Sequence, residues 1–397
     1  MPEIENLEPV EPQVALRRTS SHFRRDIQGL RALAVVLVVL AHANVPHLGG
    51  GYIGVDVFFV ISGYVITELL RRQPDASIRK NLAGFYSRRI RRIVPASSVV
   101  LVATVVAAYY WLGPATRVPL LSDVRWSEFF AANWRLIQTS SSYFIPGVPP
   151  SLVTQYWSLG VEEQFYIIFP LIVFTVAMLF AARRRPLALA VVLGAAIIAS
   201  SWWSIHLTGI NATEAYYSPF TRFWELALGG ILTLAPASWA RRTPRLNAVL
   251  GTLAIVVVAL SAFWLTDLSV YPGSLAWWPC AGAAVLLWTG QASARGGPAS
   301  WLSWRPVTYV GDVSYSFYLW HYAWLMLPLQ YATTPMAPWS RLLQVLGAFV
   351  CAVISYHFLE NPIRHSKWLD ARPWASLGLL LGFLGAVYAV TVIYGAA

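Results

Sequence analysis

The sequence contains little charge and almost no cysteine. Of its 397 residues, 12% are Asp, Glu, Lys or Arg and 57% are hydrophobic, whereas soluble domains average roughly 25% charged residues. This composition excludes an ordinary soluble domain and predicts a chain embedded in a lipid bilayer. The only two cysteines, Cys280 and Cys351, lie inside apolar stretches. We therefore expect packing residues and predict neither a disulfide nor a metal site.

Short motifs that mark many soluble enzymes are also absent. There is no HExxH, Walker loop, G-x-S-x-G or paired CxxC, so no motif presents a zinc site, a phosphate-binding loop or a covalent serine or cysteine carrier. The stretch GGGYIG at residues 49–54 matches G-x-G-x-x-G by its letters. Because it joins two apolar stretches rather than a strand and a helix, we do not interpret it as a dinucleotide site.

Long apolar stretches fill most of the chain. A spanning helix needs about 20 mainly apolar residues, and the stretches predict an all-α polytopic membrane protein with ten or eleven transmembrane helices. We expect one domain over residues 24–397, with a ten-helix core to about residue 362 and an extra C-terminal helix at about 374–394. The eleven stretches begin near Ile27, Tyr52, Ile93, Phe165, Leu187, Phe220, Asn247, Leu275, Val307, Leu342 and Trp374.

Basic residues cluster on one side of the predicted membrane. With a cytoplasmic N-terminus, 23 of the 29 Lys and Arg residues fall in inner segments and four in outer segments. This asymmetry predicts that the N-terminus is cytoplasmic. An anionic membrane surface accounts for most of the net charge of +11 without nucleic acid. Residues 1–23 are polar and lack the apolar core of a signal peptide, so we expect a disordered cytoplasmic tail.

One outer segment, residues 113–157, is longer than the other connections. Trp126, Phe129, Phe130 and Trp134 recur at helical spacing beside charged residues, which predicts an amphipathic helix at the membrane interface. Connections of this length are usually lids, binding loops or disordered. The aromatic residues favour a lid or a binding loop.

Two ionisable residues occur in the first apolar stretch, IQGLRALAVVLVVLAHANVP. Arg31 and His42 are 11 residues apart, which is about three helical turns and about 16 Å on one stripe of a helix. Either residue has an ordinary explanation, as a snorkelling arginine or a hydrogen-bonded interfacial histidine. Ionisable groups in a span cost about 2.5–3.5 kcal/mol on insertion scales and usually face an interior or a wet cavity. We expect both to border one polar cavity.

Carboxylates in other stretches are candidates for the same cavity. The second stretch contains Asp56, and the fourth begins with Glu162 and Glu163. Adjacent residues on a helix point about 100° apart, so we expect at most one of the two glutamates to aim squarely at a given site. With the predicted orientation, these carboxylates and His42 fall toward the outer half of the membrane. A histidine near a carboxylate is suited to accept a proton from a hydroxyl group.

Two further pairs complete the set of cavity candidates. Arg222 and Glu225 are at i, i+3 in the sixth stretch, where a salt bridge between them is the simpler interpretation. Asp312 and His321 lie in the ninth stretch. His321 fits a packed core histidine as well as a reactive one.

The third stretch follows a strongly basic segment, residues 71–92. Arg88, Arg89, Arg91 and Arg92 stand immediately before it. Membrane orientation needs only one or two of them. Four guanidinium groups at this spacing would also bind phosphates, because arginine grips phosphate oxygens in a bidentate manner.

Taken alone, these residues leave three classes of function open. The buried charges fit an enzyme, a proton- or solute-translocating transporter that uses them as a relay, or a scaffold in which they form structural ion pairs. Ion or solute flux without substrate turnover would favour the transporter. Normal function after the joint neutralisation of Arg31 and Asp56 would favour the scaffold.

The chain resembles acyltransferase family 3, the integral-membrane O-acyltransferases of surface glycans and macrolides. Seven segments carry the resemblance in family order over nearly the whole chain. They are the R-x10-H spacing of Arg31 and His42, GYIGVDVFFVISGYVIT, FYSRRIRRIVP, YWSLGVEEQFYIIFP, TRFWELALGG, VSYSFYLWHY and FLENPIR.

The resemblance implies an acyl-CoA donor, acetyl-CoA by default, used from the cytoplasm, and an acceptor hydroxyl on the membrane or its outer side. It implies that His42 is the catalytic residue, that Arg31 and Glu163 are required, and that the arginines at 88–92 handle the donor. The expected location is the cell membrane of a bacterium. Relatives with an added esterase-like domain act on large glycans; this chain ends after the eleventh stretch, which leaves a carbohydrate or a macrolide acceptor open.

These inferences combine into one hypothesis of direct acyl transfer, with a transient acyl-histidine as the open alternative. His42 acts as general base and is oriented by Asp56 or Glu163. Arg31 lines the donor path, and residues 113–157 cover the acceptor. We expect no metal and no nucleic acid partner.

Overall fold

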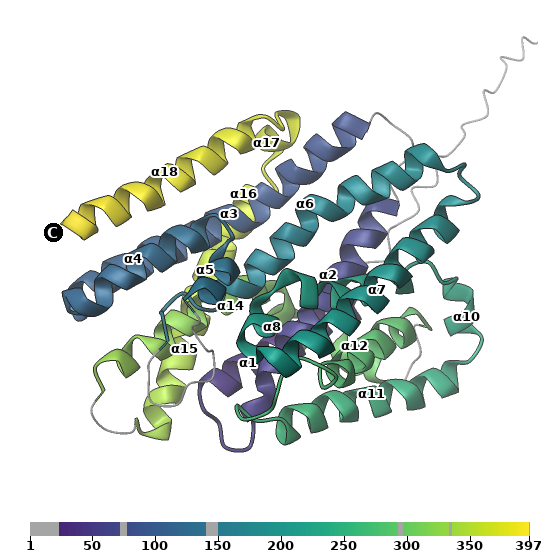
Figure 1. Ribbon diagram of the computed structural model, residues 1–397, viewed down its shortest axis with the longest axis horizontal. Helices are drawn as coiled ribbons and strands as arrows, with labels where there is room; N and C mark the ends of the chain where they lie inside the picture. The colour runs from purple at the N-terminus through teal and green to yellow at the C-terminus, as the bar shows by residue number, and fades with distance from the viewer. Residues whose placement is uncertain (1–23, 72–77, 140–149, 293–296, 333–335, 397) are drawn as a thin grey trace, which may run out of the picture.

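The computed structural model describes residues 24–71, 78–139, 150–292, 297–332 and 336–396. Within these ranges every regular element is a helix, and the long helices lie side by side (Figure 1). The predicted all-α class is therefore confirmed. The expected tail, residues 1–23, lies outside the described residues.

Each of the eleven predicted stretches coincides with a helix. Apolar side chains favour helices in a bilayer because a helix satisfies its backbone hydrogen bonds internally. The eleven helices are α1 (Arg25–His42), α2 (Gly54–Arg71), α3 (Ile78–Trp111), α6 (Tyr156–Leu179), α7 (Arg185–Ile210), α9 (Phe223–Leu232), α11 (Pro244–Trp264), α12 (Trp277–Thr289), α14 (Arg305–Met326), α15 (Pro338–Ser355) and α18 (Ala375–Ala396).

Shorter elements connect these helices. They are α4 (Pro114–Glu128), α5 (Ala132–Gln138), α8 (Ala212–Tyr217), α10 (Ala237–Arg241), α13 (Pro298–Leu302), α16 (Asn361–Arg364) and α17 (Lys367–Ala371), with 3-10 turns at Gly49–Ile53, Pro219–Thr221, Gly290–Ala292 and Pro328–Gln330 and a π turn at Tyr356–Glu360.

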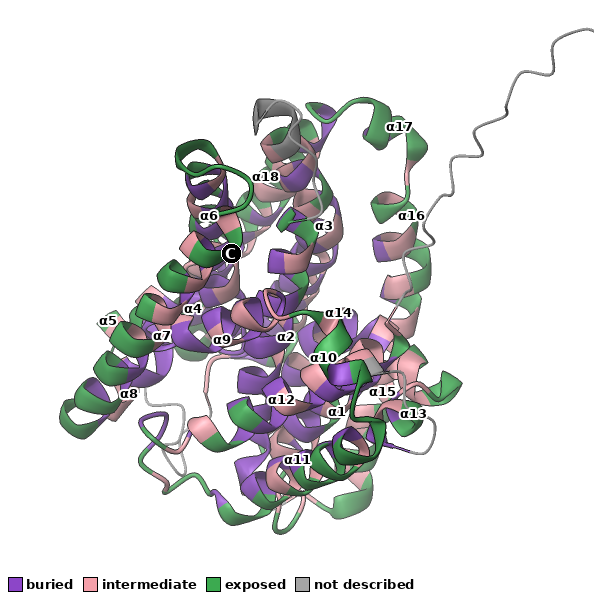
Figure 2. Cartoon of the chain, turned by 90° about the vertical axis from the view of Figure 1, so that its right-hand side faces the viewer, coloured by how far each residue is buried: buried purple, intermediate pink, exposed green. Residues whose placement is uncertain are grey.

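Seven helices of the described chain are long and apolar enough to cross a membrane by length and composition: α2, α3, α6, α7, α11, α15 with its continuation, and α18. Helices α9 and α12 are shorter, with 10 and 13 residues. The protein is thus a multi-pass membrane protein. Figure 2 shows that buried residues concentrate on the inner helices, including α2 and α12.

Two helices begin well before the predicted start. Helix α3 begins at Ile78 rather than near Ile93, and α6 begins at Tyr156 rather than near Phe165. The arginines expected in a loop before the third stretch are therefore part of α3. Hydropathy ends an apolar stretch at its first charged turn, whereas a helix continues through charged residues when they face a polar interior.

Close helix packing holds the inner helices together. Helices α1 and α14 pack extensively on each other, as do α2 and α9. At the second crossing, a Cβ atom on Gly63 would lie 1.8 Å from the Leu226 carbonyl oxygen, and one on Gly229 would lie 1.9 Å from that of Val60. Only glycine allows two helix backbones to approach this closely.

The first part of the long outer segment, residues 113–139, contains two helices rather than one amphipathic helix. Helices α4 and α5 are separated at Phe130, whose backbone adopts a left-handed conformation with φ of 52°. Phe129 is 66% exposed, while the indole nitrogen of Trp134 donates to the Gln164 side-chain oxygen at 3.2 Å. Residues 140–149 lie outside the described residues, so the predicted lid remains a prediction.

Candidate active site

A cavity of about 600 Å³ lies among α1, α2, α3, α6 and α14. One end is lined by arginines from the start of α1, from the first half of α3 and from α16. The opposite end is lined by apolar and aromatic side chains of α2, α6 and α14. The lining residues include Arg24, Arg31, Phe58, Ser62, Val65, Leu69, Arg88, Arg89, Arg91, Arg92, Ser158, Leu159, Glu162, Glu163, Tyr166, Ser314, Tyr315, Tyr318, Arg364 and Asp370.

The charge of this lining is strongly positive. Seven arginines and three carboxylates border the cavity, which leaves an excess of four positive charges. All of these arginines except Arg31 come from segments that the sequence assigns to the inner face. An excess of guanidinium groups around a concave space attracts an anion.

Part of this charge is neutralised inside the protein. Arg89 lies 2.7 Å from Glu163 and 3.8 Å from Glu162, and Arg91 lies 2.6 Å from Asp370. The two adjacent glutamates thus both reach one guanidinium, although Glu163 is closer. Only Glu163 is hydrogen-bonded to Arg89, whereas Glu162 accepts hydrogen bonds from the Ser62 and Tyr166 hydroxyls. Their position in the outer half of the membrane stays a prediction.

Four cavity arginines form no ion pair with a carboxylate of the described chain: Arg31, Arg88, Arg92 and Arg364. The Arg31 side chain donates to the Gln28 side-chain oxygen at 3.0 Å. Arg24, just outside α1, differs because it pairs with Asp26. Burial alone would lower the pKa of Arg24, but the bond to Asp26 raises it above its usual value.

The far end of the cavity closes at Tyr318. The Tyr318 hydroxyl lies 2.7 Å from the Ser158 hydroxyl and donates to the Gln155 carbonyl oxygen at 3.1 Å. Phe58 packs against the same ring, with centroids 6.3 Å apart. These contacts join α14 to α2 and α6, so they form part of the cavity wall.

Two histidines lie directly behind this wall. Ser314, Tyr318 and His321 are at i, i+4 and i+7, so they share one face of α14. The rings of Tyr318 and His321 are 5.4 Å apart between centroids, and His42 Nδ1 lies 3.0 Å from His321 Nε2. Arg31 borders the cavity, as expected, but His42 is not among the lining residues.

The expected partners of His42 form ion pairs with arginines instead. Asp56 lies 2.7 Å from Arg222, and Glu163 pairs with Arg89. Neither carboxylate therefore orients His42 in this structure. From α14, His42 is contacted by a second imidazole, His321, and by the ring of Tyr322, whose centroid lies 4.9 Å away. Charge complementarity explains the difference, because a buried carboxylate is stabilised more by a guanidinium than by a neutral ring.

Asp56, Arg222 and Glu225 form a separate buried cluster between α2 and α9. Arg222 lies 2.7 Å from Asp56 and 3.1 Å from Glu225, which confirms the predicted pair of Arg222 and Glu225. All three residues are fully buried. Phe59 and Trp157 contribute aromatic rings within 6 Å of the guanidinium. None of the three lines the cavity, so their expected place there is wrong.

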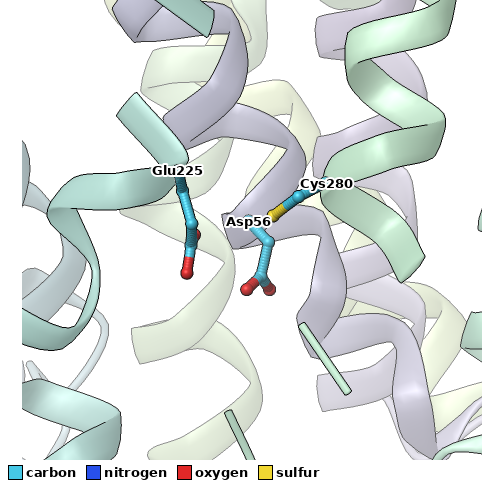
Figure 3. A group of neighbouring side chains, drawn as sticks. All are labelled: Asp56, Glu225 and Cys280. Atoms are coloured by element: carbon cyan, nitrogen blue, oxygen red, sulfur yellow. The ribbon is translucent and has the colours of Figure 1, made fainter. Parts of the chain in front are cut away.

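The same cluster includes a cysteine from α12. Figure 3 shows Asp56, Glu225 and Cys280 converging from three helices, and their potential ligand atoms lie within 4.8 Å of one another. Such a group could hold a metal ion. Here, however, the Arg222 guanidinium already forms ion pairs with both carboxylates, so the charge of these carboxylates is balanced by an arginine.

Asp312 is half-buried and does not line the cavity. It lies two residues before Ser314, which places it about 200° around α14 from that cavity-lining residue. The prediction of Asp312 as a cavity residue is therefore wrong.

Sequence reasoning missed three residues of the site. Tyr318 and Ser158 close the cavity, and Arg364 adds an unpaired guanidinium at its basic end. Each lies inside a segment that carries the family resemblance, VSYSFYLWHY, YWSLGVEEQFYIIFP or FLENPIR. Their individual roles depend on neighbours from other helices, which the linear sequence does not reveal.

Comparisons with known proteins identify the family of the chain. A family model described as an acyltransferase domain matches residues 24–360. A peptidoglycan O-acetyltransferase, OatA of Listeria monocytogenes, is 33% identical over 89% of this chain and 58% of its own length. The O-acetyltransferase OatA of Staphylococcus aureus is 31% identical over 87% of this chain and 58% of its own.

The chain spans little more than half the length of these relatives. No solved structure matches the chain. The family match does not favour a transporter. The relatives are bacterial and the chain has several candidate spans, so the protein is a multi-pass protein of the cell membrane.

Proposed function

This chain belongs to acyltransferase family 3, and on that premise we propose that it moves a short acyl group, acetyl by default, from acyl-CoA to a carbohydrate hydroxyl. The relatives are named for O-acetyl transfer, and one of them for peptidoglycan. Those names support a cell-wall carbohydrate as the acceptor class for this chain, ahead of a macrolide.

The observation that carries the proposal is the basic cavity. Arg31, Arg88, Arg92 and Arg364 border it without an ion pair to a described carboxylate. Guanidinium groups bind phosphate oxygens in a bidentate manner, and the CoA moiety carries three phosphates. In our account these four arginines hold the phosphates, while Arg89 and Arg91 stabilise the cavity wall through Glu163 and Asp370.

The apolar end suits the rest of the donor. Val65, Leu69 and Leu159 line the path from the arginines toward Phe58 and Tyr318. A pantetheine arm laid along this path would bring its thioester to the wall formed by Tyr318. Burial of the apolar part of the arm adds affinity in proportion to the area removed from water, at about 25 cal/mol per Å².

The transfer step uses His42 as general base. The imidazole takes the proton of the acceptor hydroxyl, and the resulting oxygen nucleophile attacks the thioester carbonyl carbon. The carbon–sulfur bond breaks, and the leaving thiolate takes the proton back from His42. An ester and free CoA result, and the imidazole returns to its neutral form. General-base assistance of this kind is worth about 10² to 10⁴ in rate.

Tyr318 lines the cavity and its ring lies 5.4 Å from that of His321, whereas neither histidine lines the cavity. In our account Tyr318 therefore moves aside for this step. Among the described residues, its hydroxyl is held by two hydrogen bonds, to Ser158 and to the Gln155 carbonyl. We expect Tyr318→Phe to retain transfer, since a ring without these bonds still swings aside. Tyr318→Trp, whose ring is larger, should reduce transfer about tenfold or more while donor affinity is retained. Equal transfer rates for both variants would contradict the proposed movement of Tyr318.

The experiment that tests the function uses purified protein in lipid vesicles. Acetyl-, propionyl- and longer acyl-CoA donors are supplied with peptidoglycan fragments, other oligosaccharides or a macrolide, and acylated products are identified by mass. We expect acetyl transfer to a carbohydrate, and its loss in His42→Ala with CoA binding retained. No acylated product from any donor, or wild-type turnover in His42→Ala, would refute the proposal.

A further inference from the structure

The histidine pair lies at the contact between α1 and α14. His42 Nδ1 and His321 Nε2 are 3.0 Å apart, and the two rings lie nearly parallel, with an interplanar angle of 25°. His321 is fully buried. Its other ring nitrogen, Nδ1, lies 3.2 Å from the carbonyl oxygen of Phe317, one turn earlier in α14.

This arrangement determines where the protons are. A carbonyl oxygen can only accept a hydrogen bond, so His321 Nδ1 carries the hydrogen in the contact with Phe317. A neutral imidazole has one N–H group, and Nε2 of His321 is therefore the acceptor toward His42. His42 then donates from Nδ1, which leaves the lone pair of the His42 ring on Nε2.

We propose that His321 is a positioning residue for His42, fixing the tautomer in which Nε2 of His42 acts as the base. This inference rests on the proposed acyl transfer. While His42 holds the acceptor proton on Nε2, its Nδ1–H continues to donate to His321, so the positive charge is stabilised by a buried acceptor. The carboxylate that often performs this task in other enzymes is here replaced by an imidazole anchored to the α14 backbone.

The conservative variant distinguishes positioning from packing. His321→Gln keeps a side-chain oxygen that accepts a hydrogen bond at a reach similar to that of Nε2. His321→Leu fills a similar volume but provides no acceptor. We expect His321→Leu to lower kcat about 100-fold, within the range of general-base effects, with an unchanged KM for acetyl-CoA. His321→Gln should retain most of the wild-type kcat.

Controls separate this inference from loss of fold and from failure of the proposed function. Both variants should unfold near the wild-type temperature and bind CoA normally. A wild-type kcat in His321→Leu would overturn the proposal, as would equal loss of kcat in the two folded variants. The proposed function is tested separately, by acyl transfer in the wild type and its loss in His42→Ala. It can therefore hold even if the proposal for His321 fails.

A measurement without turnover tests the tautomer directly. Nitrogen NMR of histidine-labelled protein, with His42→Ala to assign its signals, reports which ring nitrogen is protonated. We expect the neutral His42 to carry hydrogen on Nδ1 in the wild type and to lose this preference in His321→Leu. A neutral His42 ring protonated on Nε2 in the wild type would refute the proposal, even if the substrate that accepts the acyl group had not been identified.

Discussion

At the scale of single residues, the buried charges divide into two groups with different roles. Asp56, Arg222 and Glu225 lie in tight packing with no exposure, whereas Arg31, Arg88 and others face a cavity. Both groups look alike in the sequence, as ionisable residues in apolar stretches. Burying a charge requires a partner, but only an open space gives it access to a ligand.

Arg222 is expected to support stability. Arg222→Met leaves the carboxylates of Asp56 and Glu225 buried without a cation, and breaking a buried pair in this way costs about 3–5 kcal/mol. The unfolding temperature of the purified variant should therefore fall clearly. Adding Asp56→Asn and Glu225→Gln should restore much of the loss, because neutral groups cost less to bury. The exposed Arg305 provides the matched control, Arg305→Met. No change in Arg222→Met would contradict the structural role.

Glu128, at the end of α4 in the outer segment, predicts a pH dependence of stability. Its side chain is buried, neither carboxyl oxygen has a hydrogen-bond partner in the described chain, and burial raises its pKa to about 7 despite nearby Arg125. The folded protein thus holds this proton more tightly than the unfolded chain. The stability that the protonated Glu128 contributes to the folded state is complete at low pH. It is lost as the pH rises from about 4.5 to about 7.

Thermal unfolding across this pH range checks the prediction. The wild type should lose stability between about pH 5 and pH 7 relative to Glu128→Gln, whose neutral amide does not titrate. The difference should level off above the folded pKa. Parallel curves for the two proteins would show that Glu128 does not contribute in this way.

At the scale of elements, glycine allows the close contact between α2 and α9. Gly63→Ala would place a Cβ atom 1.8 Å from the Leu226 carbonyl oxygen, so α2 and α9 must separate. Overpacking of this kind costs about 1–3 kcal/mol, and we expect a lower unfolding temperature. A Cβ atom on Gly378 of α18 would meet no described atom within 4 Å, so Gly378→Ala serves as the control. Equal unfolding temperatures for the two variants would contradict the packing described here.

Element positions were predictable where apolar residues dominate. All eleven helices coincide with predicted stretches, but α3 and α6 begin 15 and nine residues earlier than predicted. The parts of these helices that precede the predicted starts contain Arg88–Arg92 and Glu162–Glu163. Hydropathy excludes charged turns from a span, although charges that face a polar cavity and one another are tolerated there. The two errors therefore fall on helices that build the site.

At the scale of the whole molecule, the site combines helices far apart in the sequence. Arg31 and His42 are on α1, Arg88 and Arg92 on α3, and His321 on α14. Helical spacing predicted that Arg31 and His42 border one cavity, but only Arg31 is among the lining residues. It could not predict that Asp56 pairs with Arg222 across α2 and α9, or that His42 meets His321, because helix neighbours in space are not encoded by the spacing within one helix.

The measurement that tests the account most directly is CoA binding to purified protein by titration calorimetry. Removing Arg88 and Arg92 together, as Arg88→Gln with Arg92→Gln, should weaken CoA affinity at least about tenfold, since hydrogen bonds to charged groups contribute about 1.5–3 kcal/mol each. The control Arg305→Gln, at an exposed arginine outside the cavity, should bind like the wild type. If the wild type binds no CoA, or if the cavity variant and the control bind it equally well, the basic cavity is not the donor site.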